Sequence, residues 1–383
     1  MTNKIDKKLL SMVQTLDGKK QKVDCLVYAC NYSFAKRYLQ NLCGEVFEYP
    51  FIKAFGVKTT CEKIIHLSHL TQISYISSVA KVFAQMDISK KVMHANKVQK
   101  NLSGKGVTVA IIDTGIAEHL DFCSFENRVL VFKDFVNGKV VPYDDNGHGT
   151  FVSGVLAGNG FLSGKKYSGI APDANLIMLK ALDQNGETGS LTILNAMQWI
   201  YENKQNYNIK VVCMSFGSEP LDDADPLLQG AEALWNLGIV VVAAAGNSGP
   251  EQRTIKSPGA SGKIITVGAL DDGRYAETYD EDKFKIANFS SRGPAYNFFK
   301  PDCIASGVDI VSTSNVPTKF YSKMSGTSVS TPIVAGACAL LLQNNPNLSP
   351  LAVKRKIAAS CISLGASRNT EGYGILDIEK LCS

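Results

Sequence analysis

The sequence predicts an α/β protein: a doubly wound, mostly parallel sheet preceded by a small α+β domain. From residue 106 onward, short apolar runs rich in Val and Ile alternate with helical stretches, which is typical of parallel strands buried on both faces. Upstream, residues 23–83 alternate in the order β-α-β-β-α-β, the split βαβ arrangement of ferredoxin-like domains. The composition, 45% hydrophobic and 20% charged over 383 residues, excludes a disordered chain, a collagen and a coiled coil.

The small domain is expected at residues 23–86, after a polar, lysine-rich segment 1–22 that we expect to be flexible. Its first helix has the clearest pattern, because Phe34, Tyr38 and Leu42 recur at helical spacing and a glycine follows at a stop position. The expected strands are 23–29, 46–49, 54–59 and 73–83, and the expected helices are 32–42 and 61–70.

Residues 87–102 are polar and form an expected linker, and the large domain then occupies residues 103–383. Functional side chains collect at the carboxyl ends of strands in parallel sheets, so the residues that follow its apolar runs are the candidates for chemistry. The expected strands are 107–112, 176–179, 211–216, 239–245 and 264–268, and the expected helices include 149–157, 191–201, 225–237 and 333–342.

Charge is divided unevenly along the chain. Residues 1–100 hold 16 Lys and Arg against 7 Asp and Glu, a net +9, whereas the rest holds 24 against 28, a net −4. A basic N-terminal part is compatible with nucleic-acid binding, but its lysines are scattered and no nucleic-acid motif accompanies them. We therefore expect no nucleic-acid partner. No apolar run approaches the roughly 20 residues of a membrane helix, so no membrane partner is expected either.

The N-terminus lacks the features of a secretory signal, because its apolar stretch is short, is broken by Ser11 and Gln14, and precedes no small-residue cleavage site. The expected location is the cytoplasm, with export by another route left open. In a reducing compartment the ten cysteines are expected to be thiols. No metal site is expected, because the one candidate set matches no zinc signature; it consists of Cys43, Cys61, His66 and His69.

Two motifs supply an acid and an imidazole. The run 107–112 ends in Asp113-Thr-Gly, and an acid at the carboxyl end of a strand can orient a partner. His148 follows a turn-prone Asn-Gly and opens a helix, with a glycine on either side that leaves the imidazole uncrowded. Each residue alone is also explained as a turn or capping residue. Together they predict a base that is oriented by an aspartate.

Two further motifs supply a nucleophile and an amide. Ser328 lies among small residues at the start of an apolar helix, where free backbone N–H groups and the positive end of the helix dipole stabilise a developing oxyanion. Asn247 directly follows an apolar strand, and its amide can complete an oxyanion hole. The structural alternatives are an N-cap serine and a turn residue.

With these residues in the order Asp, His, Asn, Ser, the chain resembles the subtilisin-like serine proteases, and most of all their intracellular bacterial members. The resemblance implies a serine endopeptidase that acts through an acyl-enzyme, with Asp113, His148 and Ser328 as the triad and Asn247 in the oxyanion hole. Protein or peptide substrates are implied, and no cofactor. The resemblance covers roughly residues 90–380 and extends to the blocks 168–172, 214–217, 257–259, 289–294 and 373–374.

The upstream domain is similar to the inhibitory prodomain of that family, in which the end of the prodomain lies in the active-site cleft and is cut by the enzyme itself. The resemblance therefore implies a self-processing zymogen whose own prodomain is an intramolecular inhibitor. We expect the cut within residues 83–95. The uneven charge agrees with a basic domain docked on an acidic protease.

The resemblance also implies the substrate-binding residues. Lys256 falls at the floor of the first specificity pocket, where it favours an acidic side chain before the cut, unless its flexible stem turns to solvent. Both alternatives stay open. Ser190 and Ile193 are expected to line a further subsite. The walls of the pocket are expected to be Ser215, Phe216, Gly217, Ala243, Ala244 and Ala245.

Extracellular relatives often bind structural calcium in the loop that corresponds to residues 158–168. Here that loop contains Lys165 and Lys166 and no carboxylate, so the sequence does not support a calcium site there. A weaker site elsewhere stays open.

Other functions fit the sequence less well. An α/β-hydrolase esterase needs Gly-x-Ser-x-Gly and the chain order Ser, acid, His, whereas Ser330 stands at the last glycine position here. Sedolisin-type peptidases have a similar serine motif without the Asp and His pair. A dinucleotide-binding glycine motif would follow its strand, but Gly104 and Gly106 precede theirs. A non-enzymatic scaffold predicts the loss of a triad residue, and none is lost.

Overall fold

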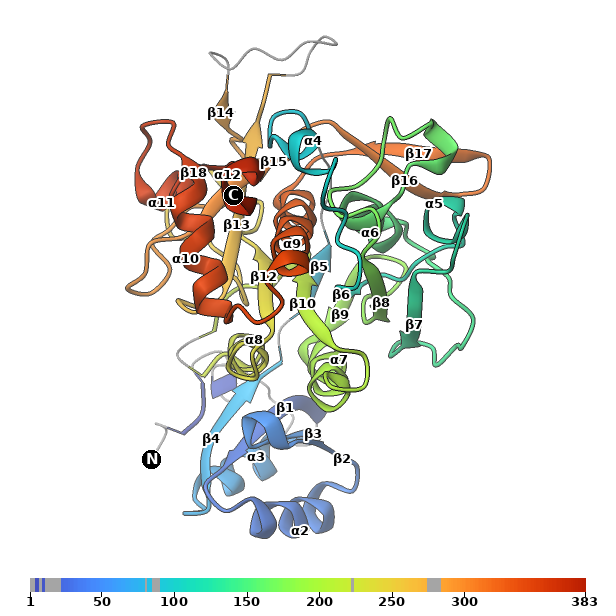
Figure 1. The fold of residues 1–383 in the computed structure, drawn as a ribbon. Coiled ribbons are helices and arrows are strands. Elements are labelled where there is room, and N and C mark those ends of the chain that lie inside the picture. Colours follow the sequence, from blue (N-terminus) through green and yellow to red (C-terminus); the bar gives the residue numbers. More distant parts are fainter. Residues whose placement is uncertain are drawn as a thin grey trace.

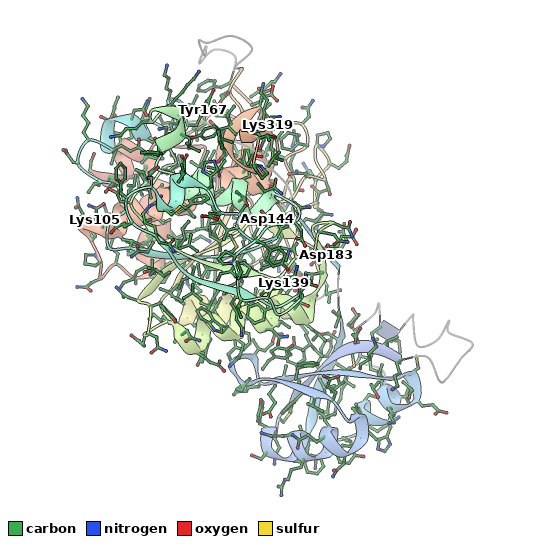
Figure 2. The ribbon with its side chains drawn as sticks, turned by 90° about the vertical axis from the view of Figure 1, so that its right-hand side faces the viewer. Lys105, Lys139, Asp144, Tyr167, Asp183 and Lys319 are labelled. Atoms are coloured by element: carbon green, nitrogen blue, oxygen red, sulfur yellow. The ribbon has the colours of Figure 1, made fainter. Side chains whose placement is uncertain are left out.

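The computed structural model describes residues 4–6, 9–10, 22–79, 81–84, 90–221, 224–273 and 284–383. A small N-terminal domain and a large domain are visible as two separate lobes (Figure 1). Seen from the side, Asp144 and Asp183 lie on one face of the large domain, above its junction with the small one (Figure 2).

The small domain confirms the predicted β-α-β-β-α-β order. All its strand pairs are antiparallel, in the order β2-β3-β1-β4. Its two helices cover one face of this sheet with apolar side chains such as Ala35, Leu39, Ile64 and Leu67. Its elements are β1 (Lys22–Ala29), α2 (Tyr32–Cys43), β2 (Val46–Tyr49), η1 (Pro50–Ile52), β3 (Ala54–Thr60), α3 (Cys61–Ser68) and β4 (Ile73–Ser78).

Both ends of the small domain differ from the expectation. Ile5 and Leu9 are buried in its core, and Ile5 forms a bridge with Ile76, although they lie in the segment that we expected to be flexible. The expected strand 73–83 is two strands in two different sheets. β4 ends at Ser78, and β5 (Lys81–Ala84) runs into the large domain, where it pairs with β9 (Glu187–Gly189) and β11 (Phe216–Gly217). The single-strand prediction was wrong because no local pattern encodes a change of pairing partner.

The large domain is built on one mixed sheet in which seven neighbouring pairs are parallel, as predicted. The order is β18-β19-β15-β13-β12-β10-β6-β8-β7, and β14 pairs with β13. Strands β6, β12 and β13 are buried along their whole length. The strands are β6 (Thr108–Asp113), β7 (Val129–Asp134), β8 (Asn175–Lys180), β10 (Ile209–Met214), β12 (Val240–Ala244), β13 (Ile265–Asp271), β14 (Lys285–Ile286), β15 (Cys303–Ser306), β18 (Cys361–Ile362) and β19 (Ile375–Leu376), with a separate hairpin of β16 (Ile310–Val316) and β17 (Lys319–Met324).

Helices α6 (His148–Ala157) and α9 (Thr327–Asn344) pack side by side against this sheet (Figure 1). Helices α7 (Ser190–Asn203) and α8 (Pro226–Asn236) lie between the sheet and the small domain. The remaining helices are α4 (Ala95–Val98), α5 (Leu120–Cys123), η2 (Phe161–Ser163), α10 (Pro350–Ser360), α11 (Arg368–Glu371) and α12 (Ile378–Cys382). Within the described parts of the chain, no helix combines the length and apolar character needed to cross a membrane.

The described part of the expected linker, residues 90–102, packs on the large domain. Met93 and Ala95 are buried there, Ile378 N donates to the carbonyl of Met93, and Gln99 Nε2 donates to the carbonyls of Gly169 and Ile170. This segment is therefore part of the large domain's surface.

Candidate active site

Asp113 is the last residue of β6, at the carboxyl end of a central strand. The β-branched run before it forms a strand that is buried on both sides, between β10 and β8. Its carboxylate Oδ1 accepts from Thr114 N at 2.7 Å, and its carbonyl accepts from Ala181 N at 2.9 Å. The first bond orients the carboxylate and the second fixes the strand end, at the edge of the sheet that the sequence predicted.

His148 is the first residue of α6, and its ring contacts Asp113. Nδ1 of His148 lies 2.6 Å from Oδ1 of Asp113, and both side chains are fully buried. A carboxylate in this place keeps the proton on Nδ1 and leaves Nε2 as a base. The turn before the helix requires Gly147, since its φ is +103° and a Cβ there would lie 2.6 Å from Asn315 Oδ1.

Asp144 is a residue of this region that sequence reasoning missed. Its Oδ1 accepts from Thr114 Oγ1 and from Gly147 N, and its Oδ2 accepts from Thr150 N. It therefore ties the end of β6 to the loop and first turn that carry His148. The signal that could have identified it is an Asp placed two residues before an Asn-Gly turn that begins a helix.

Ser328 lies in the first turn of α9, as predicted, and is completely buried. Its Oγ has no hydrogen-bond partner among the described residues, so no hydrogen bond joins it to His148. The helices that carry the two residues pack against each other (Figure 1). Catalytic hydrogen bonds of unliganded enzymes are often loose and tighten only with substrate, so this geometry is compatible with a nucleophile and its base.

Asn247 follows β12 and contacts the residue before Ser328. Its Oδ1 accepts from Thr327 N at 3.0 Å and from Thr327 Oγ1 at 2.9 Å. These bonds use the carbonyl end of the amide, so that Nδ2 is left to donate elsewhere. The first N–H groups of α9 also lack acceptors within the helix. The arrangement can therefore offer two donors to an oxyanion.

The comparison with known proteins decides the family. The Subtilase family (peptidase S8) model matches residues 104–374, which is most of the chain. This chain belongs to the subtilase family of serine proteases. It is consequently a serine endopeptidase, as predicted.

Named relatives agree with this membership. This subtilase is 44% identical to serine protease AprX of Bacillus subtilis over 312 residues, which cover 75% of this chain and 69% of the relative. It is 35% identical to subtilisin DY of Bacillus licheniformis over 289 residues, 74% of this chain and 94% of the relative. The crystal structure of fervidolysin from Fervidobacterium pennivorans matches its fold with a TM-score of 0.76 and 20% identity, covering 96% of this chain and 61% of that one.

Lys256 lies next to both expected walls of the candidate specificity pocket of this subtilase, and its N–H donates to the carbonyl of Ala245 at 2.8 Å. A Cβ placed on Gly217 would lie 2.6 Å from Lys256 Cβ, and a Cβ on Gly246 would lie 2.4 Å from Lys256 Cγ. The Lys256 stem therefore fills the space that the two glycines leave. Its ammonium forms an ion pair with Glu219, a partner that sequence reasoning missed because nothing local links the two residues. The other expected wall residues, Ser215, Phe216 and Ala243–Ala245, are buried.

Ser190 and Ile193, expected in a further subsite, lie in the first turn of α7. Both are completely buried, and Ile193 is part of the large hydrophobic core. The structure therefore places them in the interior, directly after β9, and not on an open surface.

The extended strand β5 lies between β11, which belongs to an expected pocket wall, and β9, which directly precedes Ser190; we call β9 and β11 the candidate substrate-binding segments. Its backbone pairs antiparallel with Phe216–Gly217 on one side and with Glu187–Gly189 on the other. The register aligns Ala84 with Phe216 and Lys81 with Gly189. A peptide in this position has the extended form and the edge-to-edge pairing of a bound protein substrate.

Cys213 is the titratable group of β10 nearest to the site. Burial raises the pKa of its thiol to about 12, and the carboxylate of Asp113 acts in the same direction. Its Sγ lies 3.5 Å from Ser215 Oγ. Since only a thiolate is a strong nucleophile, Cys213 is inert at neutral pH.

The residues around the loop 158–168 do not fit a calcium ion. The carboxylate of Asp121, which approaches this loop, accepts from Leu162 N at 3.1 Å and from Tyr321 OH at 2.8 Å. Lys90 Nζ donates to Ser168. The carboxylate of Asp121 is thus already bonded to N–H and O–H donors of the protein, and a lysine ammonium lies at the end of the loop. Among the described residues, the one cluster with metal-ligand spacing is His94, Asp377 and Glu379, and there Lys97 Nζ lies 2.7 Å from Glu379.

Proposed function

We propose that Asp113, His148 and Ser328 are the catalytic triad of this subtilase and that the chain is a self-processing zymogen. The observation that carries the triad is the buried hydrogen bond of 2.6 Å between Asp113 and His148. The observation that supports the zymogen is the pairing of β5 with both candidate substrate-binding segments.

In this proposal Ser328 Oγ attacks the scissile carbonyl and His148 Nε2 takes its proton. The same imidazole then gives the proton to the leaving amine, and water resolves the acyl-enzyme. Asp113 holds the Nδ1–H tautomer and stabilises the imidazolium that forms. Asn247 Nδ2 and the backbone N–H of Ser328 stabilise the oxyanion.

Replacing Asn247 by Ala is expected to lower kcat by about 10²- to 10³-fold with little change in KM, the size of loss known for the corresponding donor of a subtilisin. The amide donates only when negative charge develops on the carbonyl oxygen, so the ground-state complex is not affected. Steady-state hydrolysis of a chromogenic peptide measures both constants. A loss confined to KM contradicts the oxyanion role.

In the zymogen, the small domain at residues 23–86 acts as the inhibitor, and the peptidase domain begins after the segment 87–102. The small domain docks on α7, where Tyr49 OH donates to the carbonyl of Leu191 at 3.2 Å. Gly56 permits this close approach, because a Cβ there would lie 2.8 Å from Leu191 Cδ2. Strand β5 pairs with the expected pocket wall at Phe216–Gly217 and ends at Ala84, so we expect the cut just after Ala84. Residues 85–89 of the expected processing region lie outside the described residues.

For the residue before the cut, we propose that Lys256 selects an acidic side chain and that Glu219 opposes this selection. The ammonium is paired with Glu219, so this carboxylate competes with an acidic substrate side chain for the same positive charge. Glu219→Gln is expected to raise kcat/KM for a peptide with Glu before the cut, relative to the matched Gln peptide, by about fivefold. Lys256→Met is expected to abolish any preference for Glu. Equal ratios in wild type and both variants mean that the stem points to solvent and selects nothing.

Labelling with a fluorophosphonate probe tests the proposed triad. The full-length chain is first left to process itself and is then incubated with the probe, and the modified peptide is identified by mass spectrometry. We expect a single adduct on Ser328, and none in Asp113→Asn within the same time. Absence of labelling in wild type would identify a non-catalytic scaffold, and an adduct on another serine would reassign the nucleophile.

A further inference from the structure

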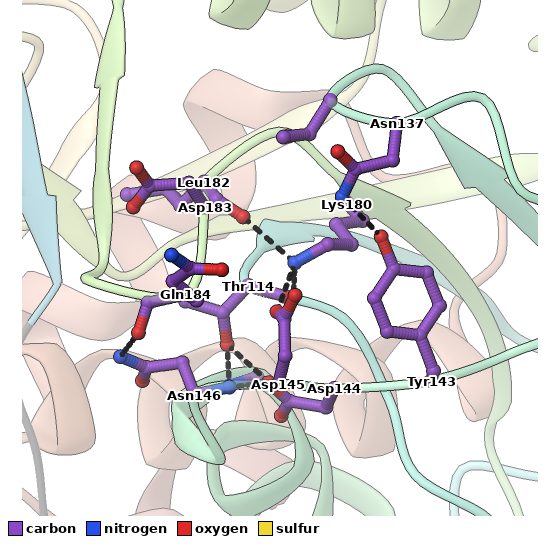
Figure 3. Close-up of polar contacts among 12 residues, drawn as sticks. Thr114, Asn137, Tyr143, Asp144, Asp145, Asn146, Lys180, Leu182, Asp183 and Gln184 are labelled. Atoms are coloured by element: carbon purple, nitrogen blue, oxygen red, sulfur yellow. Dashed lines mark hydrogen bonds and ion pairs between the residues drawn. The ribbon is translucent and has the colours of Figure 1, made fainter.

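Lys180 is a completely buried cation beside the proposed Asp113–His148 pair. It ends β8, and its register neighbours are Asp113 on β6 and Asp134 on β7. Its Nζ donates to the carbonyl of Thr114 at 2.6 Å, to Asp145 Oδ1 at 2.6 Å and to the carbonyl of Leu182 at 3.0 Å (Figure 3). Nothing in the triad chemistry described above uses this residue.

The three contacts require the ammonium form. An –NH₃⁺ group has three donors and no acceptor, and here each donor has an oxygen to bond. The ring of Tyr143 lies 4.9 Å from Nζ and adds an attractive aromatic face. A buried charge is retained in a protein only when it is paired and hydrogen-bonded, and Lys180 meets both conditions.

The acceptors belong to the segments that carry the two catalytic groups. Thr114 directly follows Asp113 and donates its N–H to that carboxylate, while its Oγ1 accepts from Gly149 N in the first turn of α6. Asp145 lies in the loop that leads into His148 (Figure 3). A single ammonium group therefore holds the strand end of Asp113 and the loop of His148 at once.

We propose that Lys180 is a positioning residue that holds the Asp113 strand end and the His148 loop in their catalytic arrangement. The inference rests on the proposed triad. A displacement of about 1 Å between catalytic groups is enough to cost about 100-fold in rate, so a link of this kind affects turnover more than substrate binding.

The charged groups around His148 provide a readout that distinguishes a positioning role of Lys180 from a purely structural one. They come from Asp113 on β6, from Asp144 and Asp145 in the loop before α6, and from Lys180 on β8; the titratable thiol of Cys213 lies on β10. Removing the ammonium leaves its partner carboxylate unneutralised, which favours imidazolium. Removing the charge of Asp145 leaves the ammonium unneutralised, which disfavours imidazolium.

The test compares Lys180→Met and Asp145→Asn in the processed chain, with kcat, KM and the pH dependence of kcat/KM as readouts. For Lys180→Met we expect kcat to fall at least about tenfold with KM within about threefold, and the acidic limb of the profile to move to higher pH. For Asp145→Asn we expect that limb to move to lower pH, by about 0.3 unit or more.

Lys300→Met is the matched control. Lys300 is also completely buried, and its Nζ bonds the carbonyl of Ile264, Thr266 Oγ1 and Asp302 Oδ2, away from the triad. We expect this control to lower the melting temperature and to leave the acidic limb unchanged.

Three results overturn the proposal. One is a Lys180→Met enzyme with wild-type kcat, another is an equal shift of the limb in the Lys300 control, and the third is an unmoved limb in Asp145→Asn. The measurement on Asp145→Asn tests the proposal even if Lys180→Met does not fold. The side chain of Asp145 is 30% exposed and Asn has the same shape, so we expect this variant to fold. Failure of the triad itself is recognised separately, by a wild-type chain that does not take the fluorophosphonate on Ser328.

Discussion

Replacing Ser328 by Ala is expected to lower kcat by about 10⁶-fold and to leave KM nearly unchanged, the size of loss known for the nucleophile of a subtilisin. The substitution removes one oxygen atom that makes no hydrogen bond in the folded chain, so nothing in the fold opposes it. Because this variant cannot process itself, it is cut in trans by affinity-tagged wild-type enzyme, which is then removed before peptide hydrolysis is measured.

Ser330→Ala is the matched control for this variant. Ser330 lies in the same helix, and its Oγ donates to the carbonyls of Ala305 and Ser306. Its loss is expected to lower the free energy of unfolding by about 1 kcal/mol while activity stays within a few-fold of wild type. An inactive Ser330→Ala beside an active Ser328→Ala would contradict the role of Ser328 as the nucleophile.

Replacing Asp113 by Asn is expected to lower kcat by about 10⁴-fold at neutral pH. The carboxylate accepts from Thr114 N and from the ring of His148. An amide in its place donates to Nδ1, so the imidazole adopts the tautomer with the proton on Nε2 and can no longer act as a base. The size of the loss is measured by single-turnover hydrolysis, which separates the chemical step from product release.

Asp134→Asn is the matched control, because Asp134 ends the edge strand β7 and is likewise a buried carboxylate at a strand end. Its bonds go to Tyr143 OH and to backbone N–H groups of its own loop. Activity of this control is expected to stay within a few-fold of wild type. Equal losses of activity in the two variants would show that activity depends on any buried carboxylate at a strand end. Asp113 would then have no specific catalytic role.

The fold was largely predictable because its strands are encoded locally. Runs such as 107–112 and 239–245 are apolar and β-branched, and the structure makes them the buried centre of the sheet. The edge strand β7 was missed, since its apolar run is only four residues long and its residues are mostly half-exposed. The split of the expected strand 73–83 was also missed, because β5 is defined by partners more than 100 residues away.

The candidate site was predictable to a different degree for different residues. Asp113, His148, Asn247 and Ser328 each stand in a short motif, and the structure joins Asp113 to His148 and Asn247 to the residue before Ser328. Asp144, Lys180 and Glu219 carry no such motif. Their partners come from distant segments, and a local pattern does not tell which charges meet after folding.

The most direct test of the central claim is the intact mass of the purified full-length chain beside that of Ser328→Ala. Wild type is expected to lose its N-terminal domain by a cut just after Ala84, at the end of β5, and Ser328→Ala is expected to keep its full length. A variant that shortens at the same bond as wild type would contradict the account, because the cut would then not depend on the proposed nucleophile.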